Sequence, residues 1–161
     1  MSALKKRQLA VNSGVAPEPR SAAADALSAL VVQVFRLNGR LLAVGDELAG
    51  IAGQTSARWF VLAAVERAPA SVAQIAQRLN LARQSVQRVA DLLVQEKLAS
   101  YEDNPHHRRA KLLQLTPTGR AALRKIQAAQ RPWAESLGAK IGEAELRQAN
   151  DILGRVLESL T

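Results

Sequence analysis

Five polar residues within two helical turns carry chemistry that could read a DNA sequence. Arginine can bond guanine, and glutamine can bond adenine, through paired hydrogen bonds at base edges in the major groove. Both types occur together here, as Arg83, Gln84, Ser85, Gln87 and Arg88. An ordinary amphipathic helix can hold two such residues on its solvated face. Five of them in one segment favour contact with double-stranded DNA.

A second basic group lies in a predicted hairpin further along the chain. Strands are predicted over residues 100–103 and 110–115, because turn residues separate two runs of strand-forming character. Arg108, Arg109 and Lys111 lie at or beside the tip. The negative potential of a narrow minor groove attracts arginine. Neighbouring strand residues point to opposite faces, so we expect Arg108 to enter the groove and Arg109 to brace the turn.

A helix-turn-helix is needed to present the polar segment, and the sequence predicts one. Ser71 followed by Gln74 is typical of a capping box, which satisfies two free N–H groups at a helix start. A break at Asn80 and Leu81 separates this helix from a second one over residues 82–97. Such an arrangement leaves the second helix free to enter a major groove. A two-stranded ribbon is unstable alone, so the hairpin must pack on these helices as a wing.

Residues 1–20 are predicted to form a mobile tail, and the remaining segments are predicted to be helical. The tail carries a basic cluster, but a short charged terminus of this kind is usually only solvated. A helix over 21–51 is too long for one small lobe to cover, so it kinks near Gly39 or Gly45 or packs on a second subunit. A helix over 56–67 follows, Pro117 starts another, and Pro132 kinks or stops it. The final helix has a narrow apolar seam suited to a partner. We expect homodimerisation through both chain ends, with these residues in the interface: Leu27, Leu30, Leu146, Leu153, Val156, Leu157 and Leu160.

Composition supports a soluble protein that binds a polyanion. The net charge is +8 over 161 residues. Residues 78–125 hold 10 Lys/Arg and 4 Asp/Glu, a net charge of +6. The rest of the chain holds 12 Lys/Arg and 10 Asp/Glu, a net charge of only +2. No cysteine is present, which excludes disulfides and thiolate zinc sites within this sequence. No uninterrupted apolar run approaches the roughly 18 residues of a membrane span. We therefore expect a cytoplasmic protein that does not enter a membrane.

Five segments in register resemble the MarR family of bacterial transcriptional regulators. They are Arg58–Leu62, Ile75–Leu79, Ser85–Val89, Asn104–Ala110 and Leu115–Arg120. The resemblance covers most of the chain beyond Ser21. Three positions depart from the family pattern: Ala82 replaces a serine that caps the recognition helix, Lys97 a glycine, and His107 an aspartate. The first departure weakens one helix end, and the last removes a carboxylate that accompanies the wing arginines.

The resemblance also raises the question of a small-molecule effector. Similar proteins often bind small aromatic or amphipathic acids between their dimerisation and DNA-binding lobes. Arg36, Arg40, Arg58 and Trp59 could supply an arginine and an aromatic wall for a carboxylate ligand. The plainer interpretation, which we favour, places Trp59 in the core and the arginines in solvent.

Metal binding and catalysis find little support in the sequence. His106 and His107 lie near Glu102 and Asp103, but neighbours in a hairpin point apart, and a zinc site needs at least three convergent ligands. The two histidines could strengthen wing contacts at lower pH, since histidine gains charge near neutrality. No phosphate-binding glycine loop is present, and a nucleophilic triad needs an oriented histidine. We predict no cofactor, no metal and no enzyme activity.

The sequence thus predicts a mainly α protein with a small two-stranded β wing, a winged helix-turn-helix with helical dimerisation arms. Its predicted parts are a tail (1–20), an N-terminal dimerisation helix (21–53), a DNA-binding domain (54–116) and C-terminal linker and dimerisation helices (117–161). The expected function is a homodimeric regulator, a repressor, that reads a pseudo-palindromic operator and is released by an aromatic or amphipathic acid. The alternative is a winged-helix module that binds protein rather than DNA.

Overall fold

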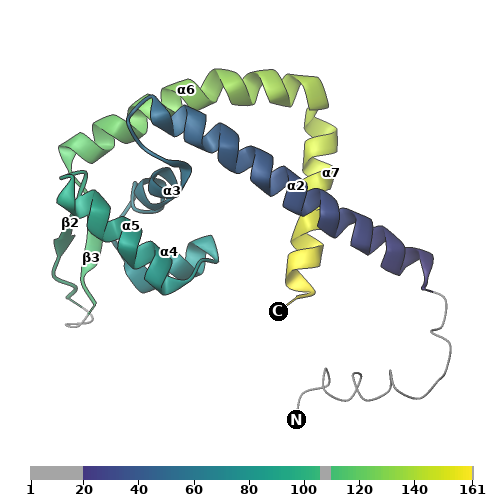
Figure 1. Cartoon of the computed structure of the whole chain (residues 1–161), viewed down its shortest axis with the longest axis horizontal. Helices are drawn as coiled ribbons and strands as arrows, with labels where there is room; N and C mark the ends of the chain where they lie inside the picture. Colours follow the sequence, from purple (N-terminus) through teal and green to yellow (C-terminus); the bar gives the residue numbers. More distant parts are fainter. Residues whose placement is uncertain (1–19, 106–109, 161) are drawn as a thin grey trace, which may run out of the picture. The chain divides into compact units, whose positions relative to one another are not determined.

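The computed structural model describes residues 20–105 and 110–160. The described part is mostly helical with one small antiparallel sheet (Figure 1). In chain order, the elements are α2 (Ala22–Gly50), α3 (Ser56–Ala64), β1 (Ala70–Ser71), α4 (Val72–Leu79), α5 (Arg83–Gln95), β2 (Ala99–Glu102), β3 (Leu112–Leu115), α6 (Pro117–Ile141) and α7 (Glu143–Glu158). The mainly α winged helix-turn-helix expected from the sequence is confirmed.

Two compact units divide the chain, residues 1–40 and residues 41–161. The described part of the first unit is the N-terminal portion of α2, which runs without interruption from Ala22 to Gly50. The helix continues through Gly39 and Gly45, the two positions near which a kink was expected. Apolar side chains along it are exposed, with Phe35 at 74% and Val32 at 56%. The basic N-terminal tail lies outside the described residues.

By length and composition, α2 could cross a membrane, with a mean hydropathy of 1.4 over an 18-residue window. The segment holds no uninterrupted apolar run of that length, because Arg36 and Arg40 break it. Averaged over a helical window, it is nevertheless apolar. A single helix of this kind is weak evidence for a span, since the core helix of a soluble protein and a signal sequence pass the same test.

The second unit holds the hydrophobic core. Helices α3, α4 and α5, the sheet and the start of α6 enclose it, and these fully buried side chains fill it: Val61, Leu62, Ile75, Val86, Leu93, Leu113, Leu115, Leu123 and Ile126. Each comes from an apolar stripe at helical or alternating spacing. Burying a residue of this size contributes about 1.5–3 kcal/mol. This core fixes the orientation of α5.

The sheet has three strands in the order β1-β3-β2, rather than the two expected. Ala70 pairs with Leu113 and Ser71 with Leu112, so the residues before α4 add a short strand to the wing. The other side of β3 pairs with β2. This third strand ties the wing to the start of the helix-turn-helix. A strand of two residues leaves no alternating pattern that a sequence reading could detect.

Local capping signals are confirmed where the sequence predicts them. The Ser71 hydroxyl accepts from the Gln74 N–H, and the Gln74 side chain accepts from the Ser71 N–H at 2.8 Å, which completes the capping box. Thr116 caps α6 by accepting from the Gly119 N–H at 3.0 Å. Pro117 occupies the first helical turn. Pro132, however, does not stop α6, which continues to Ile141.

Glycine is required at the junction between the wing and α6. A Cβ added to Gly119 would lie 1.9 Å from the carbonyl oxygen of Leu98. That oxygen also accepts from the Thr116 N–H at 3.1 Å and from the Thr116 hydroxyl at 3.0 Å. The backbone of α6 therefore packs directly on the chain entering β2. We refer to this contact of Leu98, Thr116 and Gly119 as the wing base.

Candidate nucleic-acid interface

Helix α5 presents a polar face away from the core. Val86, Ala90 and Leu93 form its buried side. The residues predicted to contact DNA lie on the remaining surface: Arg83, Gln84, Ser85 and Arg88 are exposed, and Gln87 is half-buried. The helix begins at Arg83, so both an arginine and a glutamine stand in its first turn, where free N–H groups favour anions.

Both ends of α5 lack the residue that would stabilise them best. Ala82 occupies the N-cap position with an extended backbone and makes no side-chain cap hydrogen bond. At the other end, Lys97 has a left-handed backbone with φ of 61°. The Leu98 N–H bonds the Leu93 carbonyl at 2.9 Å and the Lys97 N–H bonds the Val94 carbonyl at 3.0 Å, the two bonds of a Schellman motif. Glycine adopts this backbone most easily.

A network of three side chains joins α5 to strand β2. The Gln87 amide nitrogen donates to Asp91 Oδ1 at 2.9 Å and to the Tyr101 hydroxyl oxygen at 2.8 Å. The Tyr101 hydroxyl in turn donates to Asp91 Oδ1 at 2.8 Å. We call these residues the Gln87 network. The role of Tyr101 could not be predicted from the sequence, because its contact crosses between elements. The i, i+4 spacing of Gln87 and Asp91 is the local signal that the sequence offers for this network.

Tyr101 is held in its neutral, donating form. Partial burial, together with the hydrogen bond to Asp91 and the negative charge of Asp91, raises the pKa of Tyr101 to about 12, and the hydrogen bond from Gln87 lowers it by less. An unfolded tyrosine loses its proton near pH 10. Between these two values the unfolded state releases a proton that the folded state keeps, so stability falls as pH rises.

The Tyr101→Phe variant tests this assignment. At about pH 8 the variant should be less stable than the wild type, because it lacks the hydroxyl bonds. By about pH 11 the gap in unfolding free energy should shrink, since only the wild type loses stability through this proton. Urea unfolding at both pH values measures the gap, and a gap that stays constant would contradict the raised pKa.

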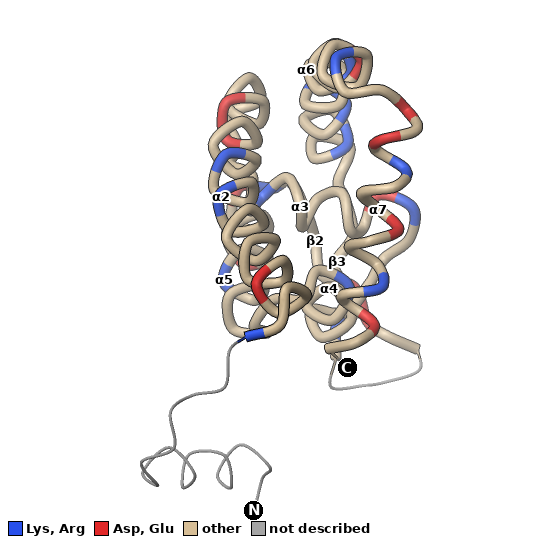
Figure 2. The backbone as a smooth tube through the Cα atoms, turned by 90° about the vertical axis from the view of Figure 1, so that its right-hand side faces the viewer, with Lys and Arg blue, Asp and Glu red and all other residues tan. Residues whose placement is uncertain are grey.

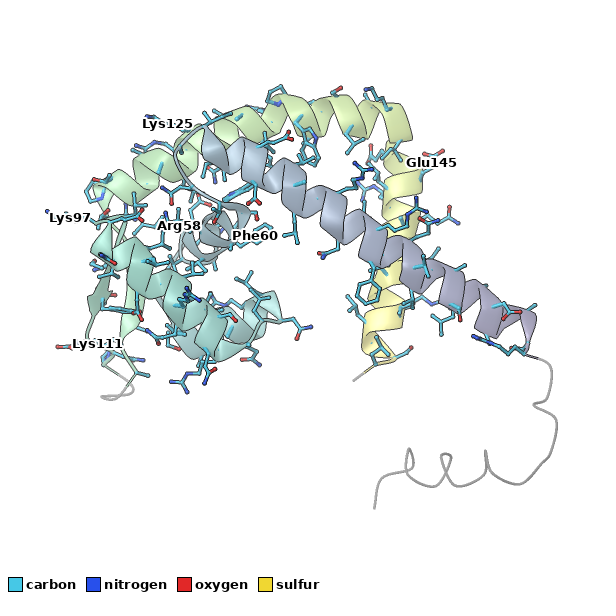
Figure 3. The ribbon with its side chains drawn as sticks, in the orientation of Figure 1. Arg58, Phe60, Lys97, Lys111, Lys125 and Glu145 are labelled. Atoms are coloured by element: carbon cyan, nitrogen blue, oxygen red, sulfur yellow. The ribbon has the colours of Figure 1, made fainter. Side chains whose placement is uncertain are left out.

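The wing places one predicted DNA contact within the described residues. Lys111 is exposed and lies near the tip of the wing, whereas Lys97 lies at its other end (Figure 3). A hollow of about 220 Å³ separates the wing from the helices, and Ser71, Arg83, Gln87, Tyr101 and Lys111 are among its lining residues. Two cations therefore flank the Gln87 network. Arg108, Arg109, His106 and His107 lie outside the described residues.

The four residues considered for binding an acid ligand differ from one another in burial and in bonding partners. Arg58 forms a two-pronged ion pair with Glu96, at 2.6 Å and 3.0 Å, which links α3 to the end of α5. Trp59 is partly buried against the core and stacks on Phe60, with ring centroids 6.0 Å apart. Arg36 and Arg40 are exposed on α2. Within residues 20–105 and 110–160, no three His, Asp or Glu side chains gather to form a metal site.

The predicted dimerisation residues are wholly or partly exposed in the single chain. Leu27, Leu157 and Leu160 are exposed by 50%, 63% and 79%, while Leu30, Leu146, Leu153 and Val156 are half-buried. Helix α7 has no buried residue. It also carries basic and acidic residues along its length (Figure 2).

Comparison with known proteins decides the family. The MarR family model matches residues 52–110, which run from the α2–α3 loop through α5 and β2. The chain belongs to the MarR family. An uncharacterised protein of Mycobacterium tuberculosis is 38% identical over 136 residues, spanning 84% of this chain and 95% of the relative.

Solved MarR structures share the fold of this MarR-family protein. A mutant MarR from Escherichia coli in complex with operator DNA is 20% identical with a TM-score of 0.74, covering 85% of this chain and 99% of that one. Staphylococcus aureus MarR in complex with salicylate and kanamycin is 18% identical with a TM-score of 0.69, covering 86% and 95%. Both the family resemblance inferred from the sequence and the expected fold of a transcription regulator are thus confirmed.

Proposed function

We propose that this protein is a cytoplasmic, homodimeric repressor that binds a pseudo-palindromic DNA operator. The observation that carries the proposal is the outward polar face of α5, with Arg83, Gln84, Ser85 and Arg88 exposed in a MarR-family fold. Lys111 adds a cation beside that face. The E. coli relative in complex with operator DNA supports the same use of this surface. Each recognition helix would enter a major groove, with half-sites about one turn apart.

Dimerisation is proposed from the apolar surface that a single chain leaves exposed on α2 and α7. Large apolar side chains exposed in such number along one helix mark an interaction site. We propose the N-terminal dimerisation helix (21–53) and the C-terminal helices (117–161) as the pairing arms, and residues 54–116 as the DNA-binding domain. A dimer interface also accounts for the apolar character of α2 without a membrane. Light scattering should give twice the chain mass of 17.3 kDa.

The effector is proposed to be a small aromatic or amphipathic acid, supported by the salicylate complex of the S. aureus relative. Because Arg58 already pairs with Glu96, an acid bound at Arg58 would compete with that carboxylate. Such competition would loosen the contact between α3 and the end of α5. An acid can shift DNA affinity only through a difference in its binding to two arrangements of the protein.

Replacing Arg83 by alanine tests DNA binding directly. Using a duplex selected from random DNA, we expect affinity to fall roughly tenfold and the salt dependence of log K to lose about one unit of slope, because one cation no longer displaces counterions. Fluorescence anisotropy over a salt series measures both quantities. Arg124→Ala, which removes an exposed arginine from α6, is the matched control and should bind as the wild type does.

Equal binding by Arg83→Ala and wild type at every salt concentration would contradict the proposed interface. A wild-type protein that binds no duplex at all would instead favour the alternative, a winged-helix module that recognises protein.

A further inference from the structure

The Gln87 amide is fixed in one orientation by its partners. A primary amide has two N–H donors, and here one goes to Asp91 and the other to Tyr101. Rotating the amide by half a turn would place its carbonyl oxygen against the Asp91 carboxylate, where neither oxygen carries a proton. Tyr101 does not relieve that repulsion, because its hydroxyl proton is already donated to Asp91 Oδ1.

The free group of Gln87 is therefore an acceptor. Among the described residues, no hydrogen bond reaches Gln87 Oε1, and this oxygen is not one of the buried atoms without a partner. The residue lies on the exposed side of α5, next to Arg83 and Lys111 around the same hollow. A polyanion held by those two cations would meet an amide that offers an oxygen and keeps its N–H groups turned inward.

We propose that Gln87 reads DNA as a lone acceptor and selects a base that carries an amino group, adenine or cytosine. This inference rests on the proposed function and adds the chemistry of one base contact. In the major groove, adenine and cytosine expose an amino donor, whereas guanine and thymine expose only acceptors and the thymine methyl. Gln87 Oε1 can bond the first two and is repelled by the acceptors of the others.

The Gln87 network also leads us to expect that adenine gains little over cytosine. A bidentate contact with adenine needs an amide N–H directed at the base nitrogen as well as the oxygen at the amino group. In this protein that N–H must first leave Tyr101 or Asp91, so one hydrogen bond is exchanged for another. The Asp91 bond is the harder one to give up, because hydrogen bonds to a charged acceptor are stronger. Tyr101 and Asp91 are thus positioning residues that set the specificity of Gln87.

Selection of bound duplexes from random DNA tests the proposal with three variants. The wild type should show one position in each half-site where adenine and cytosine are both accepted and guanine and thymine are disfavoured roughly tenfold. Gln87→Ala should abolish that preference at this position alone. Tyr101→Phe keeps the ring but removes the hydroxyl, so one N–H is released and the position should shift toward adenine, by roughly tenfold over cytosine. Arg124→Ala, on the exposed surface of α6, is the control and should leave this position unchanged.

Two results would overturn this inference while leaving DNA binding intact. One is a selected site in which Gln87→Ala changes no position. The other is a Gln87-dependent position that does not behave as expected. Such a position would accept only adenine in the wild type, or would keep the same base preference in the Tyr101→Phe variant. A wild-type protein that selects no sequence at all defeats the proposed function itself, and the inference with it.

Discussion

Replacing Gly119 by alanine is expected to destabilise the protein by about 3 kcal/mol. The new Cβ would lie 1.9 Å from the Leu98 carbonyl oxygen, and the obstructing atom belongs to the backbone. No side-chain rotation can relieve such a contact, so α6 must move away from the wing base. The Thr116 bonds to the Leu98 oxygen would weaken with it. For a chain of this size the melting temperature should fall by roughly 10 °C.

Gly138→Ala is the matched control for this substitution because it lies in the same helix. A Cβ at Gly138 would meet nothing within 4 Å. Alanine favours a helix over glycine, so this variant should gain about 0.5–1 kcal/mol. Thermal unfolding of both variants under identical conditions gives the comparison. Similar melting temperatures for the two would show that α6 does not pack on Leu98 as the structure has it.

Correcting both ends of α5 is expected to stabilise the protein by about 2 kcal/mol. Ala82→Ser supplies the missing acceptor at a position that already has an extended backbone, which contributes about 1 kcal/mol. Lys97→Gly removes the Cβ from a left-handed backbone and contributes about 1 kcal/mol. The two sites lie at opposite ends of a 13-residue helix, about 20 Å apart, so the effects should add.

The Lys97→Ala variant separates the backbone effect from the loss of charge. Alanine removes the ammonium group but keeps the Cβ, so it should give none of the gain. Chemical denaturation of the wild type, both single variants, the double variant and this control measures each term. A gain from Lys97→Ala equal to that from Lys97→Gly would mean that the left-handed backbone stores no strain.

Features set by neighbours in sequence were predictable, and features set by distant contacts were not. The capping box at Ser71 and the start of α6 at Pro117 depend on three or four adjacent residues. Strand β1 and the bond from Gln87 to Tyr101 depend on the wing folding back against the helices, which no local pattern encodes. Pro132 illustrates the opposite case, because a strong local rule allowed the helix to end there, whereas α6 continues to Ile141.

The candidate interface divides in the same way. Residue type and helical spacing predicted which side chains α5 would expose, and Arg83, Gln84, Ser85 and Arg88 are exposed. Spacing alone could not predict that Tyr101 would bond Gln87, or that Arg58 would pair with Glu96. The bonds to Tyr101 and Glu96 join residues 14 and 38 positions apart in the chain. The contacts of these residues with DNA or with an acid stay predictions.

The wing base holds the register of the two wing strands at the end of the hairpin that lies away from the loop. Leu98, Thr116 and Gly119 set which residues of β2 and β3 face each other, beginning with Ala99 opposite Leu115. These contacts lie at the end of the hairpin opposite the loop between Glu102 and Leu112. Evolution can therefore insert or delete residues in the loop and alter reach toward a groove, while the hairpin keeps its register. Relatives should differ most in loop size and least around these three anchors.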